Sequence, residues 1–206
     1  MSDSPFFGEL YRNPAARLNR ACRLLPSTTS YTRKLTVTLL AEIRPVRMED
    51  LQRILQLESR VWQKLGASLE ELKRRFLLFP QGFIIAVAGT EILGFSCSFM
   101  TDTDATAAAL SEAFPPRHVP RGDYFFLFGL TVDPVFRRRG IARSLVAEQL
   151  AVAEKLGCRK VQLIANSWSR PLFEDFGFRV VRPAEELYVN YRDVMPEPVL
   201  MEKALK

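Results

Sequence analysis

Residues 123–142, DYFFLFGLTVDPVFRRRGIA, constrain the fold more than any other stretch of the sequence. Positions 124–132 are aromatic, aliphatic or β-branched apart from one glycine, which predicts a buried strand. Asp133-Pro134 ends this strand, because proline has no amide hydrogen and disfavours helix in the residue before it. The basic run 137–139 and Gly140 then begin a long amphipathic helix. This order directs backbone N–H groups and the positive end of a helix dipole to one point, which predicts a phosphate or pyrophosphate site.

Two common phosphate loops are excluded, because the sequence contains neither GxxxxGK[ST] nor GxGxxG. The turn instead resembles motif A of the GNAT-type acyl-CoA N-acyltransferases, [QR]-x-x-G-x-[GA]. Arg137, Gly140 and Ala142 fill its fixed positions, and Val132 and Pro134 supply the Val-x-Pro that usually precedes it. The alternative is a basic, solvated turn that binds nothing.

The resemblance covers about residues 41–206, where the expected order of elements is β-α-α-β-β-β-α-β-α-β-β. It implies a mixed α+β GNAT fold, in which helices flank a twisted, mostly antiparallel sheet that is splayed at its central strands. It also implies acetyl-CoA as co-substrate, and no metal. The cofactor contacts that it implies are Leu130, Thr131, Val132, Arg137, Arg138, Arg139, Gly140, Ile141, Ala142, Arg143, Asn166 and Phe173.

A second family pattern, N-x-x-A-x-x-x-Y ahead of Gly-Phe, is matched in part by Asn166, Ser169, Phe173 and residues 177–178. By the resemblance, Asn166 contacts the pantetheine arm of CoA, and residue 173 lies near its thiol. The family's tyrosine is commonly proposed to protonate the leaving thiolate, but Phe173 has no proton to give. The alternatives are a strand-end turn residue for Asn166 and plain core packing for Phe173.

The predicted chemistry lacks an obvious proton acceptor. An aliphatic amine has a pKa of about 10.4, so something must take its proton near neutral pH. Family members often carry a glutamate on the central strand, but residues 124–132 contain no carboxylate. Glu58, His118 and Asp123 are therefore weak candidates, each with a paired or solvated charge as the alternative. The sequence does not identify the amine acceptor, and a non-catalytic acyl-CoA sensor on the same fold is the alternative function.

Glu58 lies within the apolar stripe of a predicted helix, not on its wet face. The stripe consists of Leu51, Ile54, Leu55, Val61 and Trp62. A carboxylate in this position is paired with an arginine, exposed at a frayed helix end, or part of a site. A salt bridge to Arg44 or Arg47 is the favoured interpretation, and binding of an incoming ammonium is the alternative.

The remaining elements follow from local signals. Residues 42–47 contain Pro45, which predicts an edge strand, and the capping box from Ser68 to Glu71 begins a second helix. The other expected elements are a hairpin of residues 82–88 and 92–100, a loop or short helix at 102–122, a helix ending near 156, a strand at 160–165, a helix at 169–176, and closing strands at 178–181 and 199–205 joined by a polar loop with Tyr188 and Tyr191.

Composition limits the classes of function. The net charge of +6 includes an excess of +4 within residues 1–40, so the domain carries too little charge for a nucleic-acid groove binder. The extension has the composition of a transit peptide, although a short helix or a misassigned translation start would also explain it; we expect it to pack loosely. Three scattered cysteines indicate a reducing, cytoplasmic setting without a zinc site. No segment is apolar enough to span a membrane, and a homodimer is left open.

Overall fold

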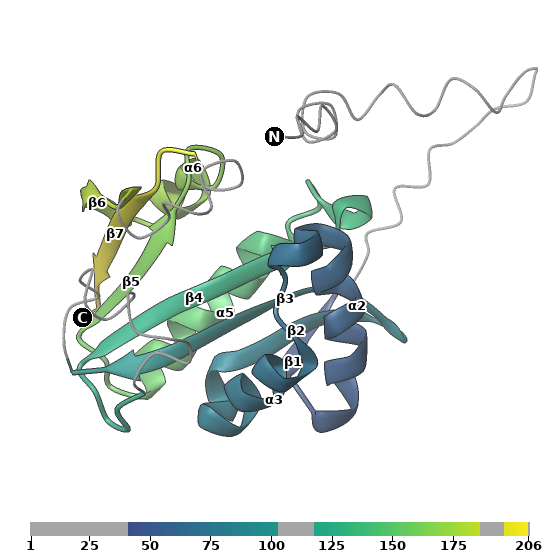
Figure 1. Cartoon of the computed structure of the whole chain (residues 1–206). Helices are drawn as coiled ribbons and strands as arrows, with labels where there is room; N and C mark the ends of the chain where they lie inside the picture. The colour runs from purple at the N-terminus through teal and green to yellow at the C-terminus, as the bar shows by residue number, and fades with distance from the viewer. Residues whose placement is uncertain (1–40, 103–117, 186–195, 206) are drawn as a thin grey trace, which may run out of the picture. The chain divides into compact units, whose positions relative to one another are not determined.

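The computed structural model describes residues 41–102, 118–185 and 196–205. Its helices and strands follow the predicted order (Figure 1), and 3-10 turns, which were not predicted, lie between some of them. They are β1 (Glu42–Pro45), η2 (Met48–Asp50), α2 (Leu51–Trp62), η3 (Gln63–Leu65), α3 (Leu69–Leu78), η4 (Pro80–Gly82), β2 (Phe83–Ala88), β3 (Glu91–Thr101), β4 (Tyr124–Val132), η5 (Pro134–Phe136), α5 (Ile141–Lys155), β5 (Lys160–Ala165), α6 (Arg170–Asp175), β6 (Arg179–Pro183) and β7 (Val199–Ala204).

Within the described residues the strands form one seven-stranded sheet in the order β1-β2-β3-β4-β5-β7-β6. Neighbouring strands in this part of the chain are antiparallel except for β4 and β5, which are parallel. Helices α2 and α3 pack on one face of β2 and β3, and α5 packs on the other, as Figure 1 shows. The mixed α+β fold with a mostly antiparallel sheet is confirmed.

Local signals placed several elements correctly. Pro45 lies in an edge strand, as its missing N–H requires. The capping box at the start of α3 is also present: Glu71 N–H donates to Ser68 Oγ at 3.2 Å, and Ser68 N–H donates to Glu71 Oε2 at 2.6 Å. Gly157 follows α5 with φ of +74°, and its N–H donates to the Glu154 carbonyl. These elements were predictable because neighbouring residues determine them.

Some predicted bounds were wrong by a few residues. The largest shift concerns α5, which begins at Ile141 and not within the arginine run. Gly140 is the N-cap residue with φ of +84°, a left-handed conformation that cannot continue a helix. Strand β1 ends at Pro45 and not at residue 47, and β3 begins at Glu91. The predictions for residues 1–40, for most of 102–122, and for Tyr188 and Tyr191 lie outside the described residues.

Candidate functional site

Strands β4 and β5 pair over only part of their length. Their register runs from Tyr124 opposite Lys160 to Leu127 opposite Leu163. Strand β4 continues to pair with β3 as far as Val132, which lies opposite Gly94. Beyond Leu127, therefore, β4 keeps one neighbouring strand and parts from the other. The predicted splay of the central strands is confirmed.

A β-bulge marks the place where the two strands part. Leu127 lies opposite Ser98 and Gly129 lies opposite Cys97, so Phe128 is an extra residue on β4. A bulge bends its strand and increases its local twist. Gly129 fits this bend closely, since a Cβ atom there would lie 3.1 Å from Cys97 Sγ. The bulge explains how β4 can turn away from β5 while it stays paired with β3.

The turn after β4 has the backbone geometry of an anion site. Arg138 has φ of +62° and Gly140 has φ of +84°, so left-handed residues occur at two alternate positions. Left-handed residues in a tight turn can direct successive N–H groups towards a common concavity that suits an anion. Gly140 offers no side-chain cap to the first N–H groups of α5, and the first turn of the helix has no acidic residue. These groups are therefore available to a phosphate.

Side chains brace this turn against the sheet. Asp133 is 6% exposed, and its carboxylate accepts hydrogen bonds from Val135 N–H at 3.0 Å and from Arg60 Nη2 at 2.7 Å. Asp133 N–H donates to the Leu93 carbonyl at 2.9 Å, and Arg137 Nε donates to the Val132 carbonyl at 3.3 Å. The turn is therefore held from β3, β4 and α2 before any ligand binds.

The arginines near the turn have different surroundings. Arg138 and Arg139 are exposed, and the Arg139 guanidinium lies 5.6 Å from the centre of the Phe136 ring. Arg143 forms an ion pair with Asp175 at 2.5 Å and lies over the Phe176 ring, which connects α5 to α6. Arg138 and Arg139 are thus more available than Arg143 to bind an anion at the turn. The cofactor role expected of Arg143 stays a prediction.

The positions of Asn166 and Phe173 also fit the alternative interpretations, which are a turn residue at the end of a strand for Asn166 and core packing for Phe173. The Asn166 side-chain oxygen accepts hydrogen bonds from Trp168 N–H at 3.1 Å and from Ser169 N–H at 2.8 Å, which closes a turn at the end of β5. Phe173 is 3% exposed, and its ring packs edge-on against Phe178 with the ring centres 5.8 Å apart. Their contacts with CoA and its thiol therefore stay predictions.

Glu58 is buried, as the periodicity of α2 indicated, with 5% of its surface exposed. Its Oε2 accepts a hydrogen bond from Ala67 N–H at 3.0 Å, and the Thr131 hydroxyl donates to the same carboxylate. Burial raises the pKa of Glu58 above its ordinary value, and these two hydrogen bonds and the nearby Arg75 lower that pKa only in part. A carboxylate with a raised pKa beside the open part of β4 is suited to accept a proton.

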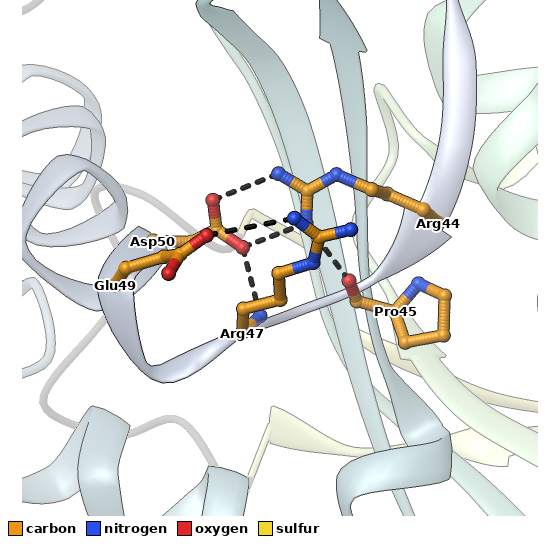
Figure 2. Close-up of polar contacts among 5 residues, drawn as sticks. All are labelled: Arg44, Pro45, Arg47, Glu49 and Asp50. Carbon is orange, nitrogen blue, oxygen red and sulfur yellow. Dashed lines mark hydrogen bonds and ion pairs between the residues drawn. The ribbon is translucent and has the colours of Figure 1, made fainter.

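The expected salt bridge from Glu58 to Arg44 or Arg47 was wrong. Arg44 donates to both oxygens of Asp50, at 2.7 and 2.9 Å, and Arg47 forms an ion pair with Glu49 at 3.5 Å (Figure 2). Asp50 also accepts a hydrogen bond from Arg47 N–H at 2.7 Å, so the pKa of Asp50 is lowered, mainly by the Arg44 hydrogen bond. Both arginines thus stabilise the turn before α2.

The other two proton-acceptor candidates lie towards the opposite end of β4. Asp123 precedes β4 and forms an ion pair with Arg159 at 3.0 Å. At about 3.3 Å per residue, the nine residues of β4 separate Asp123 from the turn by about 30 Å. His118 Nδ1 accepts a hydrogen bond from the N–H of Met100, which pairs with Phe125 near the start of β4, and burial lowers the pKa of His118. Neither residue is grouped with Glu58.

Two polar residues beside Glu58 were not predicted to act together with it. Trp62 Nε1 donates to Thr131 Oγ1 at 3.0 Å, and Thr131 is 3% exposed. The sequence did contain one signal, because Thr131 is the one aliphatic hydroxyl within residues 124–132, which are apolar apart from Thr131 and Tyr124. Pairing it with residues about 70 positions earlier required the structure.

The described part of the chain contains no group of three or more histidine, cysteine or acidic residues that could hold a metal ion. Within the same residues, no helix is both long and apolar enough to cross a membrane.

Comparisons with known proteins agree with this geometry. Residues 48–178 match the acetyltransferase (GNAT) family. The structure is similar to the GphF GNAT-like decarboxylase in complex with isobutyryl-CoA, with 25% identity, a TM-score of 0.68, and coverage of 80% of this chain and 100% of that one. It also resembles the loading GNATL domain of CurA from Lyngbya majuscula (18% identity, TM-score 0.66, coverage of 80% and 97%).

A third similar structure is the NatC complex bound to Gag peptide and CoA, with 17% identity, a TM-score of 0.62, and coverage of 81% of this chain and 99% of that one. At 18% and 17% identity, the likenesses to the CurA domain and the NatC complex establish the fold alone. A comparison with curated protein sequences found no match.

Proposed function

Because the chain belongs to the acetyltransferase (GNAT) family, we propose that it is an acyl-CoA N-acyltransferase. It transfers an acetyl group from acetyl-CoA to a primary amine of a small molecule or peptide, directly within a ternary complex. The observation that carries the proposal is the turn at residues 137–141, where two left-handed residues and an uncapped helix start offer N–H groups to the pyrophosphate of CoA.

The parting of β4 and β5 supports a route for the pantetheine arm. Residues 130–132 pair with β3 on one side only, so backbone groups on the other edge could bond to the amides of pantetheine, apart from the Val132 carbonyl, which accepts from Arg137 Nε. A backbone N–H at this edge could also polarise the thioester carbonyl as negative charge develops on its oxygen. In this arrangement Asn166 contacts pantetheine from the β5 side, and Phe173 lies near the sulfur.

Departure of CoA does not require an acid in this site. A thiol of ordinary acidity, with a pKa of about 8.5, leaves as a thiolate near neutral pH without much assistance. We therefore expect slow but real transfer despite phenylalanine at position 173. Among the three candidates for the proton acceptor, the contact with Thr131 and the raised pKa support Glu58 over His118 and Asp123.

Two measurements test this function. Calorimetry with CoA measures binding, and release of free thiol from acetyl-CoA measures turnover with a panel that includes a peptide with a free α-amine, lysine and spermidine. We expect micromolar binding and thiol release that depends on one of these amines. Binding without turnover across a broad panel would favour an acyl-CoA sensor, and no binding would remove the cofactor assignment.

Decarboxylation of an acyl-CoA is a second candidate. It is favoured by the 25% identity to the GNAT-like decarboxylase over the whole of that chain and by the absence of carboxylates from residues 124–132. Incubation with malonyl-CoA distinguishes the two reactions, because a decarboxylase forms acetyl-CoA and carbon dioxide without any amine.

A further inference from the structure

The hydrogen bonds that connect Trp62, Thr131 and Glu58 have a fixed direction. An indole N–H can only donate, so Thr131 Oγ1 accepts from Trp62. The threonine hydroxyl has one hydrogen of its own, and it donates this hydrogen to the Glu58 carboxylate. Ala67 N–H donates to the same carboxylate at 3.0 Å. Glu58 is thus arranged as the acceptor at the end of a directed chain.

Thr131 also lies at the place where chemistry is expected. It belongs to the part of β4 that has parted from β5, and it pairs with Phe95 on the other side. Its hydroxyl oxygen has two lone pairs, of which Trp62 occupies one. The second lone pair can accept a proton while the existing hydrogen moves to Glu58. Burial of Thr131 keeps bulk water from competing for these hydrogen bonds.

We propose that the Thr131 hydroxyl relays a proton from the attacking amine to Glu58, an inference that rests on the acyl-transfer function proposed above. The amine nitrogen forms a bond to the thioester carbonyl carbon, and the carbon–sulfur bond breaks to release CoA as a thiolate. The surplus proton on nitrogen passes to Thr131 Oγ1, directly or through one water, as the threonine's own proton passes to Glu58. Solvent later protonates the thiolate and recovers the proton from Glu58.

The charges around Glu58 suit this role. Burial is the main cause of its raised pKa, and Glu71 on α3 raises that pKa further. Arg75 on α3 opposes both effects; its Nη1 lies 3.9 Å from Cys97 Sγ on β3, and burial raises the pKa of that thiol. A buried glutamate with a raised pKa is a stronger base than an exposed one.

A purely structural role for Glu58 makes different forecasts. Its carboxylate holds the loop after α2 through Ala67 N–H, and a Cβ atom on Gly66 would lie 3.2 Å from Glu58 Oε2. If this were its whole purpose, removing the Thr131 hydroxyl would change stability but leave the catalytic rate and its pH dependence unchanged. The two roles are therefore separable by kinetics.

The first experiment uses the indole N–H signal of Trp62 to report the protonation of Glu58. The chain has two tryptophans, so its ¹H–¹⁵N spectrum contains two indole N–H signals, and Trp168→Phe removes the second. We expect the chemical shift of the Trp62 N–H signal to change with pH. The midpoint of this change should equal the midpoint of the acidic limb in the pH profile of kcat/KM, measured with acetyl-CoA and the best amine of the panel. Both titrations should disappear in Glu58→Gln. A kinetic limb that persists unchanged in Glu58→Gln would overturn the proposal.

The second experiment removes the hydroxyl. Thr131→Val keeps a β-branched side chain in the strand, and we expect kcat to fall about 100-fold, the lower part of the range for general acid–base catalysis, while KM for acetyl-CoA stays within twofold. Thr131→Ser should restore most of the rate. Thr101→Val is the matched control. Thr101 is a buried threonine on β3, and it lies opposite Tyr124, at the far end of the β3–β4 pair from Thr131.

The outcomes distinguish the relay from the function on which it rests. Absence of thiol release by the wild-type protein with every amine would contradict the function itself. Turnover by the wild type with an unchanged kcat in a folded Thr131→Val would contradict the relay alone. If Thr131→Val does not fold, Thr131→Ser and the Trp62 titration test the relay instead. The relay is refuted if the midpoint of the Trp62 titration differs from that of the acidic limb of kcat/KM.

Discussion

Replacing Gly140 by alanine has two expected effects, backbone strain in the free protein and weaker binding of CoA, and a control variant separates them. Gly140 has φ of +84°, and a Cβ atom there would meet no protein atom within 4 Å, so backbone strain is the cost to the free protein. Gly157, after α5, offers a matched control with φ of +74° and the same open space. A left-handed conformation costs an alanine about 1–2 kcal/mol. Gly140→Ala and Gly157→Ala should therefore lower the free energy of unfolding by similar amounts.

Only Gly140→Ala should weaken CoA binding. Its methyl group would stand over the N–H groups proposed to receive the pyrophosphate, and a hydrogen bond to a charged group contributes about 1.5–3 kcal/mol. Loss of one such bond corresponds to a rise in Kd of about tenfold to a hundredfold. Calorimetry with CoA measures this effect, and thermal unfolding measures the strain. Equal Kd values for the wild type and both variants would refute the assignment of the turn to CoA.

Three further predictions concern other parts of the domain. Asp50→Asn should cost about 3 kcal/mol at pH 7 because it breaks a largely buried ion pair with Arg44. Folding lowers the pKa of Asp50, so the wild type has this stability at pH values above the unfolded-state pKa of 3.8. It loses the stability as the pH falls through the lower pKa of the folded state, and the melting curves of the two proteins should converge there. Ser68→Ala should cost about 1 kcal/mol through loss of the cap of α3, whereas Ser59→Ala, within α2, should change little; equal effects in urea titrations would contradict the role of the cap. Phe173→Tyr should transfer acetyl at least as fast as the wild type in the thiol-release assay, and a loss of more than tenfold would mean that the ring packs too tightly to admit a hydroxyl.

Features fixed by residues close in sequence could be predicted. The capping box spans Ser68 to Glu71, and the edge position of β1 followed from Pro45 alone. Burial of Glu58 followed from the 3.6-residue period of α2. The start of α5 was misplaced because a basic run followed by glycine fits either a helix start or a turn, and the positive φ of Arg138 and Gly140 decides between them. Sequence patterns do not report φ for an arginine.

Partners distant in sequence could not be predicted. Charge alone suggested Arg44 or Arg47 for Glu58, but the short turn before α2 brings Arg44 to Asp50 instead. Glu58 receives its hydrogen bonds from Ala67 and Thr131, and Thr131 comes within reach only because the last residues of β4 contact the end of α2. The extra residue at the bulge, Phe128, likewise became apparent only from the register of β4 against β3.

The last two turns of α2 connect the two halves of the proposed reaction. Glu58 and Trp62 contact Thr131, on the segment of β4 proposed to hold pantetheine. Between them, Arg60 forms an ion pair at 2.7 Å with Asp133, whose carboxylate also bonds to the turn proposed to hold pyrophosphate. Because one rigid helix makes both contacts, a shift of α2 would move the proton acceptor and the cofactor turn together. In the proposed reaction, α2, β4 and Ala67, in the loop after α2, would therefore set the position of the base relative to the thioester.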